Sequence, residues 1–218
     1  KLPIRIEVAP AGTAASLVEH EVFIVSREMK TQLLDKLLAE TAGSVLVFSR
    51  TKHGAKKIAA MVRHMGHEAV EMHSDRSLAQ RRMALDGFKT KRFRILVATD
   101  IAARGIDVSG IELVVNYDLP SNSEDYVHRI GRTGRAGKSG KAVSFATPDE
   151  RADIKQIERL IRKTLSVVPL PVLPPRRTPP PKPNFNQAGF KPQGSFTPRS
   201  HQRPQGGFRG GFRGHRSR

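Results

Sequence analysis

The sequence of 218 residues contains no cysteine and no tryptophan, and only two tyrosines. Without cysteine, the chain can form neither a disulfide scaffold nor a zinc site with thiolate ligands, and its composition fits a reducing compartment. No apolar run approaches the roughly 20 residues that a membrane-spanning helix needs, and no signal peptide opens the sequence. These absences predict a soluble, cytoplasmic protein that has no membrane partner.

Acidic residues are missing from the last part of the chain. From Pro169 onward there are ten Lys and Arg, no Asp or Glu, and eleven of the fifteen prolines. A segment of this composition cannot bury enough apolar surface to fold alone, so residues 169–218 are predicted to be a disordered tail. Residues 1–168 keep +8 of the formal net charge of +18, which indicates a polyanionic partner for the folded part as well.

The tail ends in phenylalanine and arginine spaced regularly among glycines, over residues 206–214. Aromatic rings can stack on bases, and arginines on a flexible tether can follow a phosphate backbone, as in RGG-type RNA binders. We therefore interpret the tail as an RNA-binding segment. An inert solubilising tail is the alternative interpretation.

The rest of the chain alternates short β-branched apolar runs with stretches of helical periodicity. Strands are predicted for four runs, at residues 45–48, 94–98, 113–115 and 142–145. Helices are predicted for two apolar stripes, formed by Met29, Leu33, Leu34, Leu37 and Leu38 and by Ile154, Ile157, Leu160, Ile161 and Leu165. This alternation is typical of an α/β domain with about five or six parallel strands and helices on both faces of the sheet.

Local signals help to set the boundaries of this domain. Ser77–Gln80 and Thr147–Glu150 both have the pattern of a capping box at a helix start. We place the domain at residues 20–168 and assign residues 1–19 to an extended linker from an upstream domain. Because the sequence does not begin with methionine, we expect it to be a piece of a longer protein.

Ligands of such sheets bind beyond the carboxyl ends of the strands. There the run at 94–98 is followed by Thr99 and Asp100, and then by Arg104, Gly105 and Asp107. Helix-start amides and the Thr99 hydroxyl could hold a backbone phosphate, and the Asp107 carboxylate could accept from a ribose hydroxyl. The alternative is that Thr99 and Asp100 only cap a helix.

An arginine run lies between the last two predicted strands, at residues 128–135. Arg132 and Arg135 are three residues apart, so two guanidiniums could address one triphosphate, and Arg129 could share their helix face. A solvated surface is the alternative. The neighbouring residues 134–139 imitate a phosphate loop of the G-x-x-x-x-G-K-S type. The spacing excludes it, because Arg132 stands where the first glycine should be and a strand follows instead of a helix.

Three segments together resemble motifs IV, V and VI of the DEAD-box RNA helicases, namely Val47–Thr51, Ala98–Asp107 and His128–Arg135. They occur in that family's order, and the resemblance covers nearly all of residues 1–168. The tail resembles the bacterial RhlE-like branch. The resemblance implies a RecA-like domain of the P-loop NTPase type, as the C-terminal half of an ATP-dependent RNA helicase. An upstream N-terminal RecA-like domain would be its partner in cis.

In that family, ATP binds between the two RecA-like domains, and Mg²⁺ is held by the N-terminal one. The resemblance implies that Arg132 and Arg135 are catalytic and contact the γ-phosphate, and that Gly105 and Asp107 face the nucleotide. His128 and Arg129 would couple the nucleotide to RNA, although His128 could instead cap or pack. No metal ligands are expected in this chain. RNA-backbone contacts are implied for Arg50, Thr51, Arg81, Thr99, Asp100, Arg104 and Gly105.

The sequence departs from the family at Leu78, where glutamine usually stands three residues before the RNA-facing arginine, here Arg81. Gln80 could replace the lost side chain, but its place in the capping box is the more economical explanation. We expect this chain alone to be inactive as an ATPase. A non-catalytic RNA-binding or annealing module is the alternative function. Besides RNA, the resemblance is compatible with partners in assemblies that build ribosomes or degrade RNA, and it does not decide between them.

Overall fold

The computed structural model describes residues 18–106, 108, 110–134 and 140–175. Their centre is a parallel sheet of seven strands in the order β3-β4-β2-β5-β6-β1-β7. The strands are β1 (Val18–Ile24), β2 (Ser44–Phe48), β3 (Ala69–Met72), β4 (Ile95–Ala98), β5 (Ile111–Asn116), β6 (Gly140–Ala146) and β7 (Ser166–Val167). The helices are α2 (Lys30–Glu40), α3 (Lys52–His64), α4 (Leu78–Lys89), α5 (Asp100–Ala103), α6 (Ser123–Ile130) and α7 (Arg151–Ile161), with a 3₁₀ turn η1 (Pro148–Glu150) before α7.

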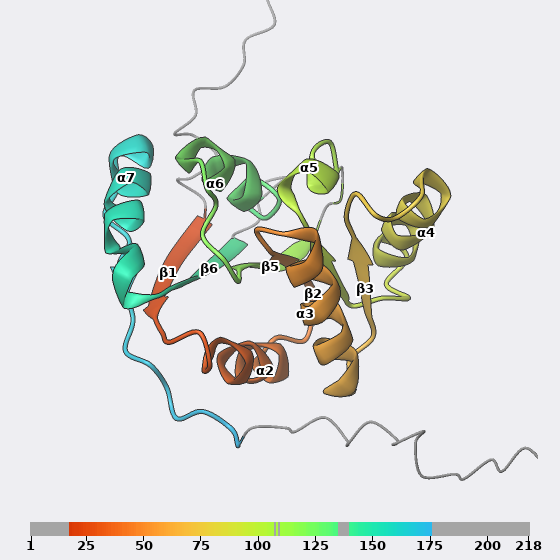
Figure 1. Ribbon diagram of the computed structural model, residues 1–218, viewed down its shortest axis with the longest axis horizontal. Helices are drawn as coiled ribbons and strands as arrows, with labels where there is room; N and C mark the ends of the chain where they lie inside the picture. The colour runs from red at the N-terminus through yellow and green to blue at the C-terminus, as the bar shows by residue number, and fades with distance from the viewer. Residues whose placement is uncertain (1–17, 107, 109, 135–139, 176–218) are drawn as a thin grey trace, which may run out of the picture. The chain divides into compact units, whose positions relative to one another are not determined.

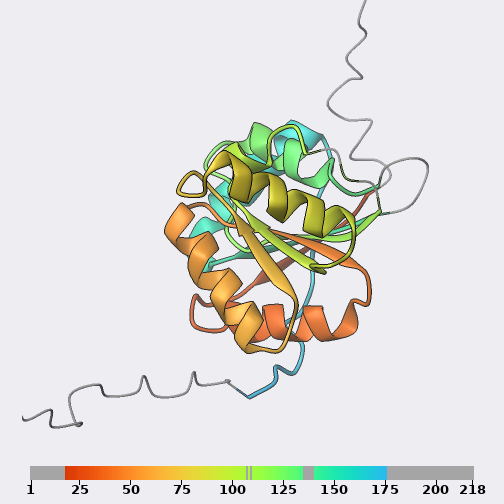
Figure 2. The ribbon, with the colours of Figure 1, turned by 90° about the vertical axis from the view of Figure 1, so that its right-hand side faces the viewer.

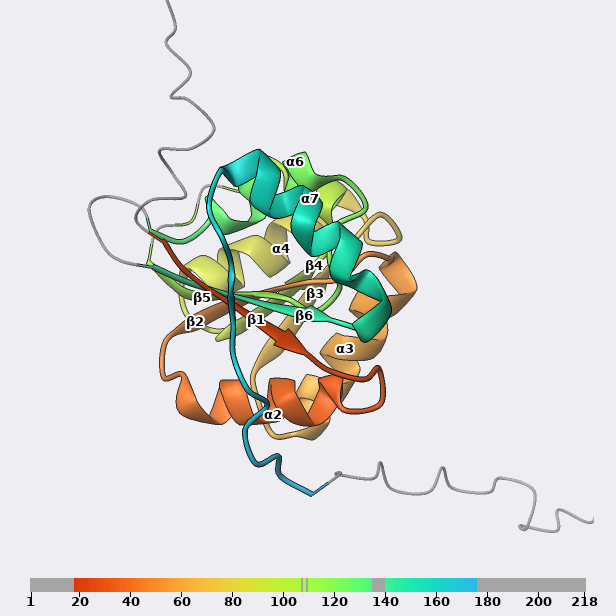
Figure 3. The ribbon, with the colours of Figure 1, turned by 90° about the vertical axis from the view of Figure 1, so that its left-hand side faces the viewer.

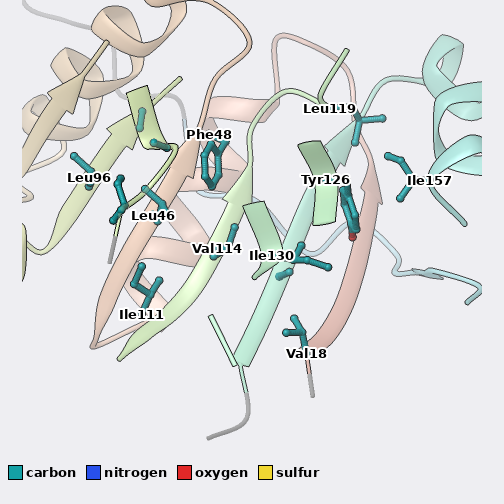
Figure 4. Packing of buried hydrophobic residues seen from close by; sticks show 14 of the residues in the cluster. Val18, Leu46, Phe48, Leu96, Ile111, Val114, Leu119, Tyr126, Ile130 and Ile157 are labelled. Atoms are coloured by element: carbon teal, nitrogen blue, oxygen red, sulfur yellow. The ribbon is translucent and has the colours of Figure 1, made fainter. Parts of the chain in front are cut away.

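Helices cover both faces of the sheet, as Figure 1 shows. One core contains apolar side chains of α4, α5, α6 and α7, and the other contains those of α2 and α3. Because both faces are covered, the central strands are apolar on both sides, and Val45, Leu46 and Val47 are fully buried in succession. Figure 4 shows side chains of the first core, among them Phe48 and Val114 of the sheet and Ile130 of α6.

The four predicted strands are confirmed as β2, β4, β5 and β6, and the two apolar stripes fall on α2 and α7. Two residues of the second stripe were wrongly placed, because Leu160 is 38% exposed and Leu165 lies beyond the end of α7. The expected number of strands was also too low. β1, β3 and β7 were not predicted, because β1 carries three polar residues in succession and β3 and β7 are only four and two residues long.

The predicted capping boxes are present. The Ser77 hydroxyl accepts from the Gln80 N–H at 3.2 Å, and the Gln80 side chain accepts from the Ser77 N–H at 3.0 Å. The Thr147 N–H donates to the Glu150 carboxylate at 2.9 Å, although this box opens the turn η1 and α7 follows from it. Gln80 is therefore used at the helix start.

The predicted domain boundaries need two corrections. Residues 18 and 19 belong to β1 and not to a linker. Residues 169–175 do not belong to a disordered tail, because Leu170 and Leu173 pack on the core beside α2 and the Pro174 carbonyl accepts from Gln32 Nε2 at 2.8 Å. Figure 3 shows this segment passing the edge of the sheet at β1 and continuing past α2. Residues 1–17 and 176–218, with the predicted linker and RNA-binding tail, lie outside the described residues.

Candidate nucleic-acid and nucleotide interface

The candidate site lies where the parallel strands end. Because the strands are parallel, the loops after β2, β4, β5 and β6 leave the same edge of the sheet. These loops and the helices that follow them carry most of the residues that the sequence analysis selected. The structure brings Arg129 and Asp100 together, and also Arg104 and Gly105 with Arg81. Arg129 and Arg132 line one small pocket but bind different acceptors.

Arg129 is the most buried charged side chain of this edge, with an exposure of 1%. Its Nε lies 2.5 Å from Asp100 Oδ1 and its Nη2 lies 2.8 Å from Asp100 Oδ2, which is a bidentate ion pair. Nη1 donates to Asn116 Oδ1 at 3.1 Å and to the Asp118 carbonyl at 2.7 Å. The guanidinium also lies 5.0 Å from the centre of the Phe48 ring. Every guanidinium nitrogen of Arg129 is thus bound within the domain.

Arg129 and Arg132 both line a small pocket at the end of α6, but they bind different acceptors there. Arg129 points into the domain, since Asp100 and Asn116 offer it a complete set of acceptors. Arg132 turns toward the loop after α5, where its Nη1 donates to the Ile106 carbonyl at 2.6 Å. Next to it, the buried Thr133 hydroxyl donates to the Ile111 carbonyl at 2.5 Å. These two hydrogen bonds attach the end of α6 to the segment between β4 and β5. Asp107 in that segment and Arg135 after α6 lie outside the described residues.

Thr99 stands at the N-cap position of α5, but its side chain makes no capping hydrogen bond. The interpretation that Thr99 only caps the helix is therefore wrong, whereas the predicted phosphate contact stays a prediction. Both oxygens of the Asp100 carboxylate accept from Arg129, and the predicted RNA contact of Asp100 stays a prediction. Gly105 has φ +75°, a left-handed conformation that glycine adopts without strain, and the loop turns there.

A shallow groove of about 210 Å³ lies between α4 and this loop. Arg81 and Leu78 line it from α4, and Arg104 and Gly105 line it from the other side. Arg81 Nε is buried and has no hydrogen-bond partner among the described residues. Leu78, at the position where the family usually carries glutamine, is 65% exposed. Because Gln80 is bound in the capping box, it does not supply the missing partner of Arg81.

Arg50 and Thr51 are already engaged at the start of α3. Arg50 Nη2 lies 2.9 Å from Glu150 Oε1, and its guanidinium also donates to the Leu119 carbonyl at 3.2 Å. The Thr51 hydroxyl accepts from the Gly54 N–H at 3.0 Å and caps α3. Thr51 is exposed and the Arg50 side chain is 43% exposed, so both remain at the surface.

Asp125 connects two of the predicted residues and was missed by the sequence analysis. Its Oδ1 lies 3.3 Å from Arg104 Nη2 and 3.8 Å from His128 Nδ1. The His128 side chain is 67% exposed, so of the two alternatives for it, packing is wrong, whereas capping is not tested. Asn116 was also missed, although a polar residue that ends an apolar run is a usable signal for a buried hydrogen bond.

Among residues 18–106, 108, 110–134 and 140–175, no group of three or more His, Cys, Asp or Glu side chains could hold a metal ion. In that same part of the chain, every helix is too short or too polar to cross a membrane.

Comparisons with known proteins agree with this arrangement. The family described as "Helicase conserved C-terminal domain" matches residues 29–137. ATP-dependent RNA helicase RhlB of Shewanella halifaxensis is 37% identical over 98% of this chain and 49% of that protein. The crystal structure of a DEAD box protein from the hyperthermophile Methanococcus jannaschii is 40% identical, with a TM-score of 0.68 over 72% of this chain and 43% of the other.

A structure of Saccharomyces cerevisiae Dbp5 bound to RNA and ADP BeF3 is 30% identical, with a TM-score of 0.68 over 75% of this chain and 44% of the other. The chain spans about half the length, or less, of the curated relatives that it matches. The chain belongs to the DEAD-box proteins, as a helicase C-terminal domain with the RecA-like fold. Its predicted fold class is thereby confirmed, whereas the narrower likeness to the RhlE branch stays a prediction.

Proposed function

We propose that this chain is the C-terminal half of an ATP-dependent RNA helicase and binds both the RNA backbone and the γ-phosphate of ATP. The observation that carries the proposal is the buried pair of Arg129 and Asp100. It joins α6, which leads into the arginine run, to α5, which leads into the loop predicted to meet RNA. Burying a guanidinium costs several kcal/mol unless acceptors are placed around it. An arginine that only solvated the surface would have no such set of acceptors, whereas Arg129 has one.

On the RNA side, the groove between α4 and the loop after α5 presents Arg81, Arg104 and Gly105. Thr99 and the Arg50–Thr51 corner extend this surface along the carboxyl ends of the strands. Guanidiniums and hydroxyls of this kind bind phosphate oxygens, so the RNA sequence has little influence on affinity. Asp100 positions the loop through Arg129.

On the nucleotide side, Arg132 and Arg135 reach the γ-phosphate held by the N-terminal domain, which also holds Mg²⁺. Gly105 and Asp107 face the ribose and the phosphates. Arg132 is bound to the Ile106 carbonyl, so the arginine that meets ATP and the loop that meets RNA are in direct contact. This contact and the Arg129–Asp100 pair would couple the two ligands, with His128 nearby at Asp125.

The test is the RNA-stimulated ATPase rate of the full-length protein. In Arg132→Ala and Arg135→Ala we expect kcat to fall by about 10³-fold or more, since an arginine that stabilises the transferring phosphoryl group contributes about 10³ to 10⁵ in related enzymes. RNA affinity without nucleotide should change less than threefold. Arg159→Ala, an exposed arginine of α7, serves as the control.

Undiminished turnover of both variants would disprove the nucleotide role of the arginine run. A parallel loss of RNA affinity would instead assign the run to RNA. The 218-residue chain alone should show no ATPase activity above background, because no phosphate loop holds the nucleotide in it.

A further inference from the structure

A second groove lies away from this interface, along the open edge of the sheet. It has a volume of about 490 Å³ and lies between β3, one side of α4 and the segment that follows α4. Its apolar lining comes from Val70, Met83, Ala84, Gly87 and Phe93. Arg63, Arg76 and Arg92 stand around it. Figure 2 shows β3 in front of the rest of the sheet, between α3 and α4.

The backbone of β3 has one free side. The Glu68 carbonyl accepts from Ile95 N–H at 3.1 Å and the Met72 carbonyl accepts from Thr99 N–H at 3.3 Å, so even-numbered residues here direct their backbone toward β4. Ala69 and Glu71 therefore direct theirs away from β4. No other strand of the described residues pairs with that side. Within the part of the chain that the structure describes, the Ala69 carbonyl accepts from the Arg63 guanidinium alone, at 3.3 Å.

The two faces of this edge differ in chemistry. Val70 packs toward the core under α4, next to the groove's apolar lining, and Met83 there is 69% exposed. Ala69 belongs to the core under α3, and Glu71 on the same face binds Arg63 and Arg76. The Glu71 side chain is 3% exposed, whereas those of Arg63 and Arg76 are 45% and 36% exposed. The arginines thus keep donors at the surface on one face, opposite apolar side chains on the other.

We propose that this edge binds an extended segment of a partner protein, which adds to β3 as a further strand and alternates apolar with acidic residues. Successive side chains of a strand point to opposite faces, so every second residue of the segment meets Met83 and Phe93, and the residues between them meet Arg63 and Arg76. Its backbone pairs with Glu71 and replaces Arg63 at the Ala69 carbonyl. The chain's own tail does not fit, because it contains no Asp or Glu from residue 169 onward.

This surface is separate from the proposed RNA groove, although both share α4. Gln80, Met83, Ala84 and Gly87 face the edge groove, whereas Leu78, Arg81 and Leu85 face the loop after α5. A strand bound at the edge would therefore contact the back of the helix that carries Arg81. The interaction does not depend on ATP or on RNA, so its test and the test of the proposed function are independent of each other.

The test uses the 218-residue chain and a fluorescent octapeptide library in which valine, leucine or phenylalanine alternates with glutamate, measured by anisotropy. We expect library members to bind with micromolar Kd and Met83→Glu to weaken binding at least tenfold, since it places a carboxylate among the apolar contacts. Arg63→Gln should weaken it three- to tenfold. Val167→Glu, an equivalent change at an exposed valine of the opposite edge strand, should leave Kd unchanged.

A peptide with N-methyl groups on every second residue separates main-chain pairing from simple charge attraction. We expect binding to be lost when the methyl groups replace the N–H hydrogens that point toward β3. Binding should be kept when they replace the N–H hydrogens that point away from β3. Equal binding of both peptides, or no binding by any library member, would overturn the proposal. Single-stranded RNA could also compete with the peptide for the groove. If Met83→Glu abolished that RNA binding, the proposal would be overturned and the groove would be an RNA surface.

Discussion

Two buried ion pairs of this domain have opposite arrangements. At the candidate interface, the arginine is buried and its acid is partly exposed, since the Arg129 and Asp100 side chains are 1% and 21% exposed. At the β3 edge, the acid is buried and the arginines are at the surface. A buried guanidinium with every nitrogen bound can only hold two segments together. Arginines that share a buried carboxylate keep donors for a further partner.

The largest effect on stability is expected at the first pair. Asp100→Asn should lower the free energy of unfolding by about 3 kcal/mol, the lower end of the range for breaking a buried pair, because Asp100 is partly exposed and Arg129 stays buried with its charge. Urea denaturation of this chain measures it. Asp125→Asn is the matched control, since Asp125 has the same 21% exposure but only surface partners, and it should cost less than about 1 kcal/mol. Equal losses would show that Arg129 is not locked by Asp100.

A smaller effect is expected at the second pair. Glu71→Gln should cost about 1 to 2 kcal/mol, because both arginines are near water and can be rehydrated when the carboxylate is lost. Measured by urea denaturation, a loss larger than that of Asp100→Asn would reverse the order of the two pairs.

The same pair makes a prediction about acid. Burial alone would raise the pKa of Glu71, but Arg76 and Arg63 outweigh it, so its pKa lies below the usual glutamate value. A lowered pKa in the folded state gives stability that is present above the ordinary pKa of about 4.3 and is lost as the pH falls through the folded value. Thermal unfolding between pH 7 and pH 3 should show that loss in the native chain and less of it in Glu71→Gln. Identical pH profiles would exclude Glu71 as a source of the acid sensitivity.

The smallest effect on stability is expected from Arg104, whose pair with Asp125 is exposed to solvent. Arg104→Ala should change the free energy of unfolding by less than about 0.5 kcal/mol. In the full-length protein it should weaken RNA binding and reduce the slope of log affinity against log salt by about 1, as the loss of one phosphate contact does. An unchanged salt slope would remove Arg104 from the RNA surface.

Much of the fold could be predicted from local patterns. The apolar runs at residues 45–48 and 94–98 are strands because β-branched side chains must be covered on both faces, and Ser77 with Gln80 marks the start of α4. β3 was not predicted because its four residues include the charged Glu71. A buried glutamate is stable there because Arg63 and Arg76 pair with it. Residues 169–175 were assigned to the tail because of their proline content, although this segment also contains three apolar side chains.

The sequence by itself determined the α/β alternation, the family and the order of its motifs, because periodicity and motif wording are local properties. Only the tertiary structure decided which arginines are locked and which are accessible. Arg129 and Arg132 look equivalent in the sequence, yet the first finds Asp100, 29 residues away, and the second finds the Ile106 carbonyl. Whether a charge can be buried depends on acceptors brought from distant loops, and the folded sheet alone brings them together.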